Sequence, residues 1–186
     1  MTMERNRQVQ VENKEAVFAQ AAEFFERAKN VPYVLGLDGN PNRLFVENAG
    51  NCTRKHFYLA SRLQTLGYQV ALGVAEFDWR NLPIPTEITS LLKNPVDSHL
   101  FLYATYGNGE MIVDATWDSG MPQGFLVNTW NGHDNTQIGV PAIRIYRENY
   151  QLTRAKALMG SVVRSVRQDR KPTPFNDAFN EWLHRR

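Results

Sequence analysis

Apolar side chains recur with the spacing of an α-helix in two stretches of the chain. Residues 14–29 carry an apolar stripe with charges on the other side, made by Val17, Ala21, Phe24, Phe25 and Ala28. In residues 52–66, apolar side chains cover much of the helical circumference, which predicts a central helix enclosed by the rest of the domain. The polar residues 1–13 are expected to be disordered.

Strands are predicted where β-type residues or apolar–polar alternation replace the helical pattern. Residues 68–77 form one such segment, and residues 99–106 and 111–114 flank a Gly-Asn-Gly turn as a hairpin. Residues 141–147 make a further strand, whose proline favours the edge of a sheet.

The connections between these elements are unusually long. Residues 31–37 are expected to be a short extended piece, while 79–97 and 116–140 are loops of a length that is often functional. Helices are predicted at 152–167 and 176–183, and the last one should dock through Phe179, Trp182 and Leu183.

The composition supports one folded domain. The 186 residues are 42% hydrophobic, which suffices for a single buried core. We expect one domain over residues 1–186, with a core at about 31–147, an N-terminal helix at 14–29 and a helical extension at 151–186. The net charge is +2, and the basic segment from Gln151 is typical of a solvated surface, so nucleic acid is not an expected partner.

Cys52 is the only cysteine, so the chain cannot form an internal disulfide or a multi-cysteine zinc site. This favours a reducing, intracellular compartment. Residues 1–14 lack the apolar run of a signal peptide, and no run of about 18 apolar residues occurs. The sequence therefore predicts a cytoplasmic protein with no membrane partner.

Cys52 also stands where a polar turn gives way to the helix at 52–66. Asn51 is the expected N-cap and Gly67 the residue that ends the helix. The free amides and partial positive charge of a helix N-terminus stabilise a thiolate over a thiol. The alternative is a small buried hydrophobe, because free cysteine is among the most buried residue types.

His99 and Asp114 are equidistant from the middle of the predicted hairpin turn. A symmetric hairpin places them opposite each other, where the carboxylate can accept from the histidine Nδ1–H. The same register pairs Phe101 with Ile112. A tight turn at Asn108-Gly109, centred two residues later, would instead pair His99 with Asp118, which is the alternative orienting group.

A thiolate, a histidine and an aspartate supply a nucleophile, a general base and a group that orients the base. These are the roles that acyl transfer through a thioester requires. The nucleophile's own backbone amide is the natural oxyanion donor, with Asn48, Asn51 or the Trp79 indole as candidates for the second. Trp117 and Trp130 are candidates to line a substrate groove, although packing beneath loops is the commoner role of such aromatics.

These residues resemble the transglutaminase-like superfamily, a branch of the papain-like cysteine fold. The resemblance rests on Gly50-Asn51-Cys52 before a helix ending in Leu-Gly-Tyr, on His99 opening a strand, and on Val113-Asp114-Ala115-Thr116 after the next strand. It covers about residues 48–118. It implies an α+β fold with the cysteine helix packed on an antiparallel β-sheet and helices flanking this core.

The same resemblance implies Cys52 as nucleophile, His99 as base and Asp114 as orienter. No cofactor or metal is expected. Leu100 and Phe101 replace the family's Ala-Trp after the histidine, and Ala115 replaces its common proline. The chain is therefore expected to be a divergent member, whose substrate cannot be carried over from relatives.

The expected function is thiol-dependent acyl transfer on the amide bonds of a peptide or protein. Hydrolysis is preferred, because neither 79–97 nor 116–140 has an acidic cluster to attract a lysine ammonium. Amine transfer of the transglutaminase type and a non-catalytic peptide-binding module remain alternatives, and the oligomeric state is left open.

Two further histidines have alternative interpretations. Cys52 and His56 are four residues apart on one helix and, with His99 and Asp114, could make a mixed zinc site. A buried, hydrogen-bonded core histidine is the preferred interpretation of His56. His133 lies in a loop and is interpreted as solvated, with a role as substitute base as the alternative.

Overall fold

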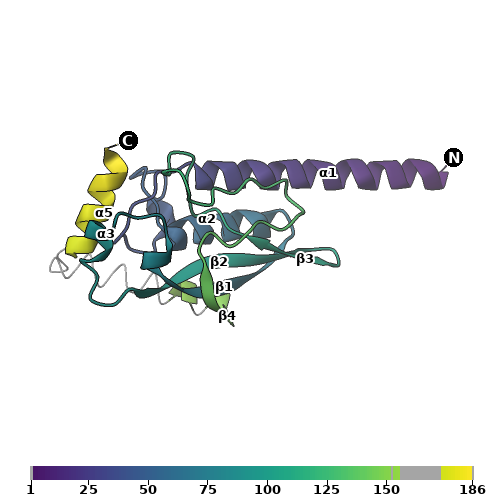
Figure 1. Ribbon diagram of the computed structural model, residues 1–186. Helices are drawn as coiled ribbons and strands as arrows, with labels where there is room; N and C mark the ends of the chain where they lie inside the picture. Colours follow the sequence, from purple (N-terminus) through teal and green to yellow (C-terminus); the bar gives the residue numbers. More distant parts are fainter. Residues whose placement is uncertain (1, 152, 156–172, 186) are drawn as a thin grey trace.

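A four-stranded antiparallel sheet forms the middle of this computed structural model, which describes residues 2–151, 153–155 and 173–185 (Figure 1). The strand order is β3-β2-β1-β4. The strands are β1 (Gln69–Asp78), β2 (Val96–Tyr106), β3 (Gly109–Val113) and β4 (Ala142–Glu148). The predicted α+β class is confirmed, and Pro141 does precede an edge strand.

Two helices cover one face of this sheet. The helix α2 (Cys52–Thr65) lies against the strands, and α1 (Thr2–Lys29) packs on α2 (Figure 1). The prediction of a disordered segment at residues 1–13 was wrong for residues 2–13, since α1 begins at Thr2. This stretch contains no glycine or proline and many good helix formers, so it can extend the helix that begins the core.

The hairpin between β2 and β3 has a different register from the one predicted. Tyr106 pairs with Gly109 and Leu102 with Val113, so Phe101 does not pair with Ile112. The turn is the two-residue Gly107–Asn108, with Gly107 at a φ of +63°, a conformation that glycine adopts without strain. Asp114 therefore lies beyond the paired residues of β3 instead of opposite His99.

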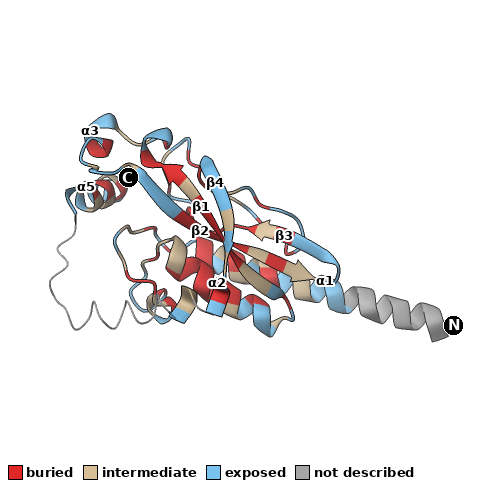
Figure 2. Cartoon of the chain, turned by 90° about the horizontal axis from the view of Figure 1, so that it is seen from below, coloured by how far each residue is buried: buried red, intermediate tan, exposed pale blue. Residues whose placement is uncertain are grey.

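The core has two main clusters. One joins α1, α2 and the sheet through residues such as Phe25, Phe57, Leu63, Leu72 and Leu102. Much of α2 is buried (Figure 2), including the unbroken run from Arg54 to Ala60, because the sheet packs against one side of the helix and α1 against another. The other cluster joins the sheet, the loops and the C-terminal helix α5 (Pro174–His184), and includes Phe77, Trp79, Trp117, Phe125 and Phe179.

The C-terminal helix docks as predicted, with Phe179 and Leu183 buried and Trp182 partly buried. The predicted helix at 152–167 lies almost entirely outside the described residues. Three short helices complete the described elements: η1 (Pro41–Arg43), η2 (Trp79–Asn81) and α3 (Thr86–Thr89). Among the helices of the described residues, none has the length and apolarity needed to cross a bilayer.

Candidate functional site

Asn51 caps the helix that carries Cys52, as predicted. Its side-chain oxygen accepts from the Arg54 amide at 2.9 Å, and its Nδ2 donates to the Leu37 carbonyl at 3.0 Å. These bonds fix the amide and leave one Nδ2 hydrogen unused by them, and Asn51 lines the cavity described below, so its role as an oxyanion donor stays a prediction. Cys52 is the first residue of α2 and is only partly buried, so a reagent can reach its thiol.

The turn before Cys52 is fixed by a short parallel bridge between Tyr33 and Gly50. The Gly50 amide donates to the Pro32 carbonyl and the Gly50 carbonyl accepts from Val34, both at 3.0 Å. A side chain at Gly50 would meet Leu44 at 2.5 Å, so only glycine fits this approach. Of the extended piece expected at 31–37, this single bridge is the β-structure that is present. It places Tyr33 beside the start of α2.

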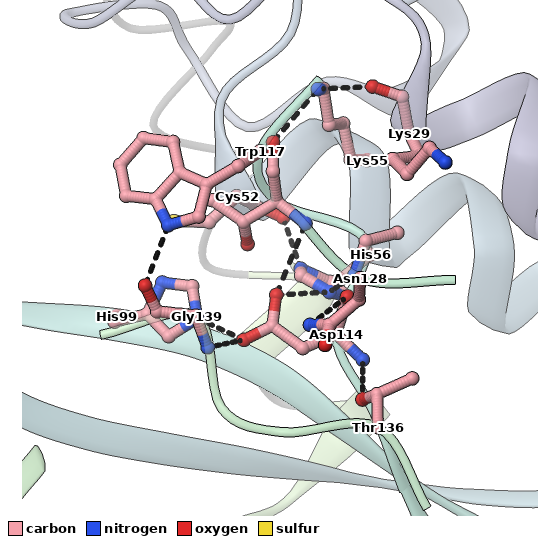
Figure 3. A network of polar contacts seen from close by, with 12 residues as sticks. Lys29, Cys52, Lys55, His56, His99, Asp114, Trp117, Asn128, Thr136 and Gly139 are labelled. Atoms are coloured by element: carbon pink, nitrogen blue, oxygen red, sulfur yellow. Dashed lines mark hydrogen bonds and ion pairs between the residues drawn. The ribbon is translucent and has the colours of Figure 1, made fainter. Parts of the chain in front are cut away.

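His99 and Asp114 meet through a hydrogen bond of 2.6 Å between Nε2 and Oδ2 (Figure 3). The contact was predicted at Nδ1, which is the wrong ring nitrogen. His99 lies on β2, and Asp114 follows the last paired residue of β3. From this position outside the strand pairing, the Asp114 carboxylate reaches Nε2 of the ring. Nδ1 is the ring nitrogen that Asp114 does not contact, and Cys52 lines the same cavity as His99, close enough to raise the pKa of the ring.

The carboxylate of Asp114 is almost completely buried and is surrounded by donors. Its Oδ2 also accepts from the Gly139 amide at 2.7 Å, and its Oδ1 accepts from the Thr116 amide at 3.0 Å. The Asp114 amide in turn donates to the Thr136 hydroxyl at 2.9 Å. The loop around residues 136–139 is therefore part of the site, which the sequence pattern did not reveal.

The two charges of this pair stabilise each other. Burial by itself would lower the pKa of His99, but the charge and hydrogen bond of Asp114, followed by the nearby Cys52, raise that pKa well above its ordinary 6.5. Burial would likewise raise the pKa of Asp114, yet the imidazolium of His99 holds it well below its usual range. At neutral pH, the pair is an imidazolium and a carboxylate.

His56 is a buried core histidine, as predicted. Its Nε2 accepts from the Ala115 amide at 2.9 Å, which leaves Nδ1–H to donate to the Cys52 carbonyl at 2.7 Å. Burial outweighs the attraction of Asp114 and lowers the pKa of His56 to about 4, so the ring is neutral. Both nitrogens are engaged, which contradicts the zinc alternative. Within the described part of the chain, no group of three or more potential ligands could hold a metal ion.

Lys55 is a site residue that the sequence analysis missed. It is fully buried, and its Nζ donates to the carbonyls of Lys29 and Thr116, both at 2.8 Å. Burial lowers its pKa to about 7 despite the nearby carboxylates of Asp118 and Asp114. A lysine within a helix that is predicted to be enclosed needs hydrogen-bond partners in the interior. Its position in that helix was therefore the signal in the sequence that could have revealed Lys55.

The structure separates several other candidates from the thiol. Asn48 is exposed and lies outside the lining of the cavity described below, so the structure gives no support to its prediction as an oxyanion donor. Trp130 donates to the Asp134 carbonyl and packs in the cluster that includes Phe25 of α1; it lines a separate cavity and not the one beside Cys52. His133 is exposed and stacks on Phe18, which fits the solvated interpretation.

Asp118 and Trp79 are near the site but already engaged. Asp118 accepts from the amides of Tyr33 and Gly120, both at 2.8 Å, so it does not orient His99. The Trp79 indole donates to Asp97 at 3.1 Å, and this contact removes it as the second oxyanion donor. Both predictions failed because side-chain partners depend on loops that pack from distant parts of the chain.

A cavity of about 160 Å³ opens beside Cys52 and His99. Trp117 lines it, as expected of a groove residue, with its indole donating to the Gly139 carbonyl at 2.6 Å. Tyr33 lines it as well, and no hydrogen bond to its hydroxyl is recorded among the described residues. The remaining lining residues are Leu35, Asn51, Thr53, Phe77, Trp79, Asp97, Ser98 and Val140.

Comparison of the sequence with models of known protein families and with curated proteins found no match. The functional argument therefore depends on the geometry of the site.

We predict that the stability conferred by His56 depends on pH. Its folded pKa of about 4 lies below its unfolded value near 6.5, so protons bind preferentially to the unfolded chain. The contribution is full above about pH 6.5 and falls as the pH is lowered toward 4, by at most about 3 kcal/mol. Urea unfolding between pH 7 and pH 4 should show a smaller loss of stability in His56→Gln than in the wild type.

The matched control is His133→Gln, which removes an exposed histidine and should keep the wild-type pH dependence. An unchanged pH dependence in His56→Gln would show that the folded protein accepts a proton on this ring.

Proposed function

We propose that the protein is a thiol-dependent hydrolase of peptide or amide bonds, built on a transglutaminase-like core. The observation that carries this proposal is the cavity that Cys52 and His99 line together, with His99 hydrogen-bonded to Asp114 on its other side. The family resemblance is supported by the position of Cys52 at the start of a helix on an antiparallel sheet, with His99 on β2 and Asp114 after β3.

The first step is acylation of Cys52. The thiolate attacks the carbonyl carbon of the substrate, and the carbonyl electrons move onto oxygen. As the tetrahedral intermediate collapses, the C–N bond breaks and the Nδ1 proton of His99 passes to the departing amine. The products of this step are a thioester, a neutral His99 and a free amine. The raised pKa of His99 supports this order, because the ring is protonated before substrate arrives.

The second step returns the enzyme to its starting state. Neutral His99 accepts a proton from water while the water oxygen adds to the thioester carbonyl. The C–S bond then breaks, which releases a carboxylic acid and restores the thiolate and imidazolium. Asp114 keeps the ring oriented and stabilises the imidazolium without giving up its own charge.

Tyr33 is proposed as the second oxyanion donor, beside the backbone amide of Cys52. Its hydroxyl has no recorded partner among the described residues, and its amide is held by Asp118. Burial, followed by the charges of Cys52, Asp97 and Asp114, raises the pKa of Tyr33 well above 10. The phenol therefore stays protonated and can donate to a developing oxyanion.

The first prediction for this function concerns the thiol. At pH 6, iodoacetamide should alkylate Cys52 about tenfold faster than an unstructured cysteine peptide, because the proposed imidazolium of His99 would stabilise negative charge on the attacking sulfur. His99→Ala should remove most of this advantage, and Asp114→Asn should reduce it by weakening the imidazolium. Mass spectrometry of timed samples measures the rates.

His133→Ala is the control and should react like the wild type, since this ring is exposed and stacks on Phe18. Equal slowing by His99→Ala and His133→Ala would contradict the assignment of the base.

Tyr33→Phe should separate oxyanion stabilisation from thiol activation. We expect acylation by p-nitrophenyl acetate to slow on the order of 100-fold, as after loss of one oxyanion donor. Alkylation by iodoacetamide has no oxyanion and should change little. Release of p-nitrophenolate and alkylation by mass spectrometry provide the two readouts, and equal slowing of both would assign Tyr33 a merely structural role.

The reaction type is tested with a library of glutamine- and amide-containing peptides, with and without excess primary amine. We expect hydrolysed products that disappear in Cys52→Ala, because water is the acceptor in the proposed second step. Mass spectrometry distinguishes the products. Cysteine-dependent amine adducts in excess of hydrolysis would establish amine transfer instead, and the absence of both products would favour a peptide-binding module.

A further inference from the structure

The cavity beside Cys52 contains one carboxylate that does not belong to the proposed triad. Asp97 lies at the start of β2, two residues before His99, and is exposed to solvent. Its Oδ2 accepts from the Trp79 indole at 3.1 Å, and its Oδ1 accepts from the Ser98 amide at 2.7 Å. These two donors hold the carboxylate in a defined position.

The charge of Asp97 is not neutralised by a neighbouring cation in the described part of the chain. No ion pair of Asp97 is recorded there, and the cavity lining contains no lysine or arginine. Among the residues that line the cavity, His99 is the one that can carry a positive charge, and that charge already interacts with Asp114 and Cys52. A ligand in the cavity therefore meets a net negative charge.

The walls of the same cavity are largely aromatic. Tyr33, Phe77, Trp79 and Trp117 all line it. Aromatic rings attract cations through their negative faces, an interaction worth about 0.5 to 2 kcal/mol that Trp provides best. A fixed carboxylate among aromatic rings favours an organic cation and disfavours a carboxylate of the substrate.

We propose that this cavity binds an alkylammonium group of the acyl substrate, with Asp97 as its counter-ion and Trp79 as the residue that positions Asp97. The assignment of this group to a substrate rests on the proposed hydrolase function. The chemistry is shared by two sources, the α-ammonium of a peptide N-terminus and the side chain of a lysine.

The bound ammonium belongs to the acyl substrate and is not the attacking amine. A neighbouring carboxylate favours the protonated form of an amine. A protonated amine has no lone pair with which to attack a thioester. Asp97 therefore recognises a charged group of the substrate, while water remains the acceptor.

The charge preference can be measured without a substrate, using three methanethiosulfonate reagents. The 2-aminoethyl reagent is cationic, the methyl reagent is neutral and the 2-sulfonatoethyl reagent is anionic. In each reaction the Cys52 thiolate attacks the sulfenyl sulfur, a disulfide forms and methanesulfinate leaves. Each rate is divided by the rate of the same reagent with an unstructured cysteine peptide. We expect this normalised rate to be higher for the cationic reagent than for the anionic one.

Asp97→Asn should lower this cation-to-anion ratio by roughly three- to tenfold, as expected for removal of one nearby charge at intermediate dielectric. Asp97→Glu keeps the charge and should retain most of the ratio. Asp134→Asn is the matched control, because it removes an exposed carboxylate outside the cavity lining and should leave the ratio unchanged. An equal ratio in the wild type and Asp97→Asn would overturn the proposal.

The two ammonium sources are separated with four aminoacyl coumarin amides. Lysyl and norleucyl compounds, each with a free or acetylated α-amine, vary the two charges independently at similar size. We expect a several-fold higher kcat/KM for the compounds that carry the recognised ammonium, and loss of that preference in Asp97→Asn. A preference for the free α-amine would identify a peptide N-terminus as the ligand, and a preference for lysyl over norleucyl would identify a lysine side chain.

The outcomes distinguish this inference from the function on which it rests. Cys52-dependent turnover without preference for either ammonium would overturn the inference and leave the hydrolase intact. No Cys52-dependent turnover, together with a cation-to-anion ratio that depends on Asp97, would retain the cation site and overturn the hydrolase.

Discussion

The buried charge of Asp114 is the constraint on which the site depends. A carboxylate that is 1% exposed is costly unless donors and an opposite charge compensate it, and removal of one partner from a buried ion pair typically costs about 3 to 5 kcal/mol. Here the donors come from three separate segments: His99 on β2, the Thr116 amide after β3 and the Gly139 amide in the loop before β4. The fold must bring these segments together for the carboxylate to remain ionised.

The same requirement organises the start of α2. His56 connects the Cys52 carbonyl to the Ala115 amide, and Lys55 connects the Thr116 carbonyl to the end of α1. Both residues bind the backbone directly after Asp114, so the helix that carries the thiol is held against the segment that carries the carboxylate (Figure 3). A site built from such buried links is preorganised, which is what acyl transfer requires of its nucleophile and base.

Much of the fold could be predicted from local patterns. The cap at Asn51, the strand β1, the edge position of β4 and the docking of α5 follow from side-chain periodicity and from residues with restricted backbones. The hairpin register could not, because Gly107, Asn108 and Gly109 are all favourable in turns and allow several loop geometries. The structure brings Cys52, His99 and Asp114 together despite the shifted register, since Asp114 reaches the ring from outside the ladder.

The sequence by itself determined which residues could carry the chemistry: one cysteine at a helix start, a histidine opening a strand and an aspartate after the next. Those roles follow from residue type and local position. Only the tertiary structure decided which ring nitrogen meets the carboxylate, that Tyr33 rather than Asn48 lies beside the thiol, and that Asp97 enters the cavity. These contacts join segments that are distant in the chain or depend on loop packing, and no periodic pattern encodes the direction of a single side chain.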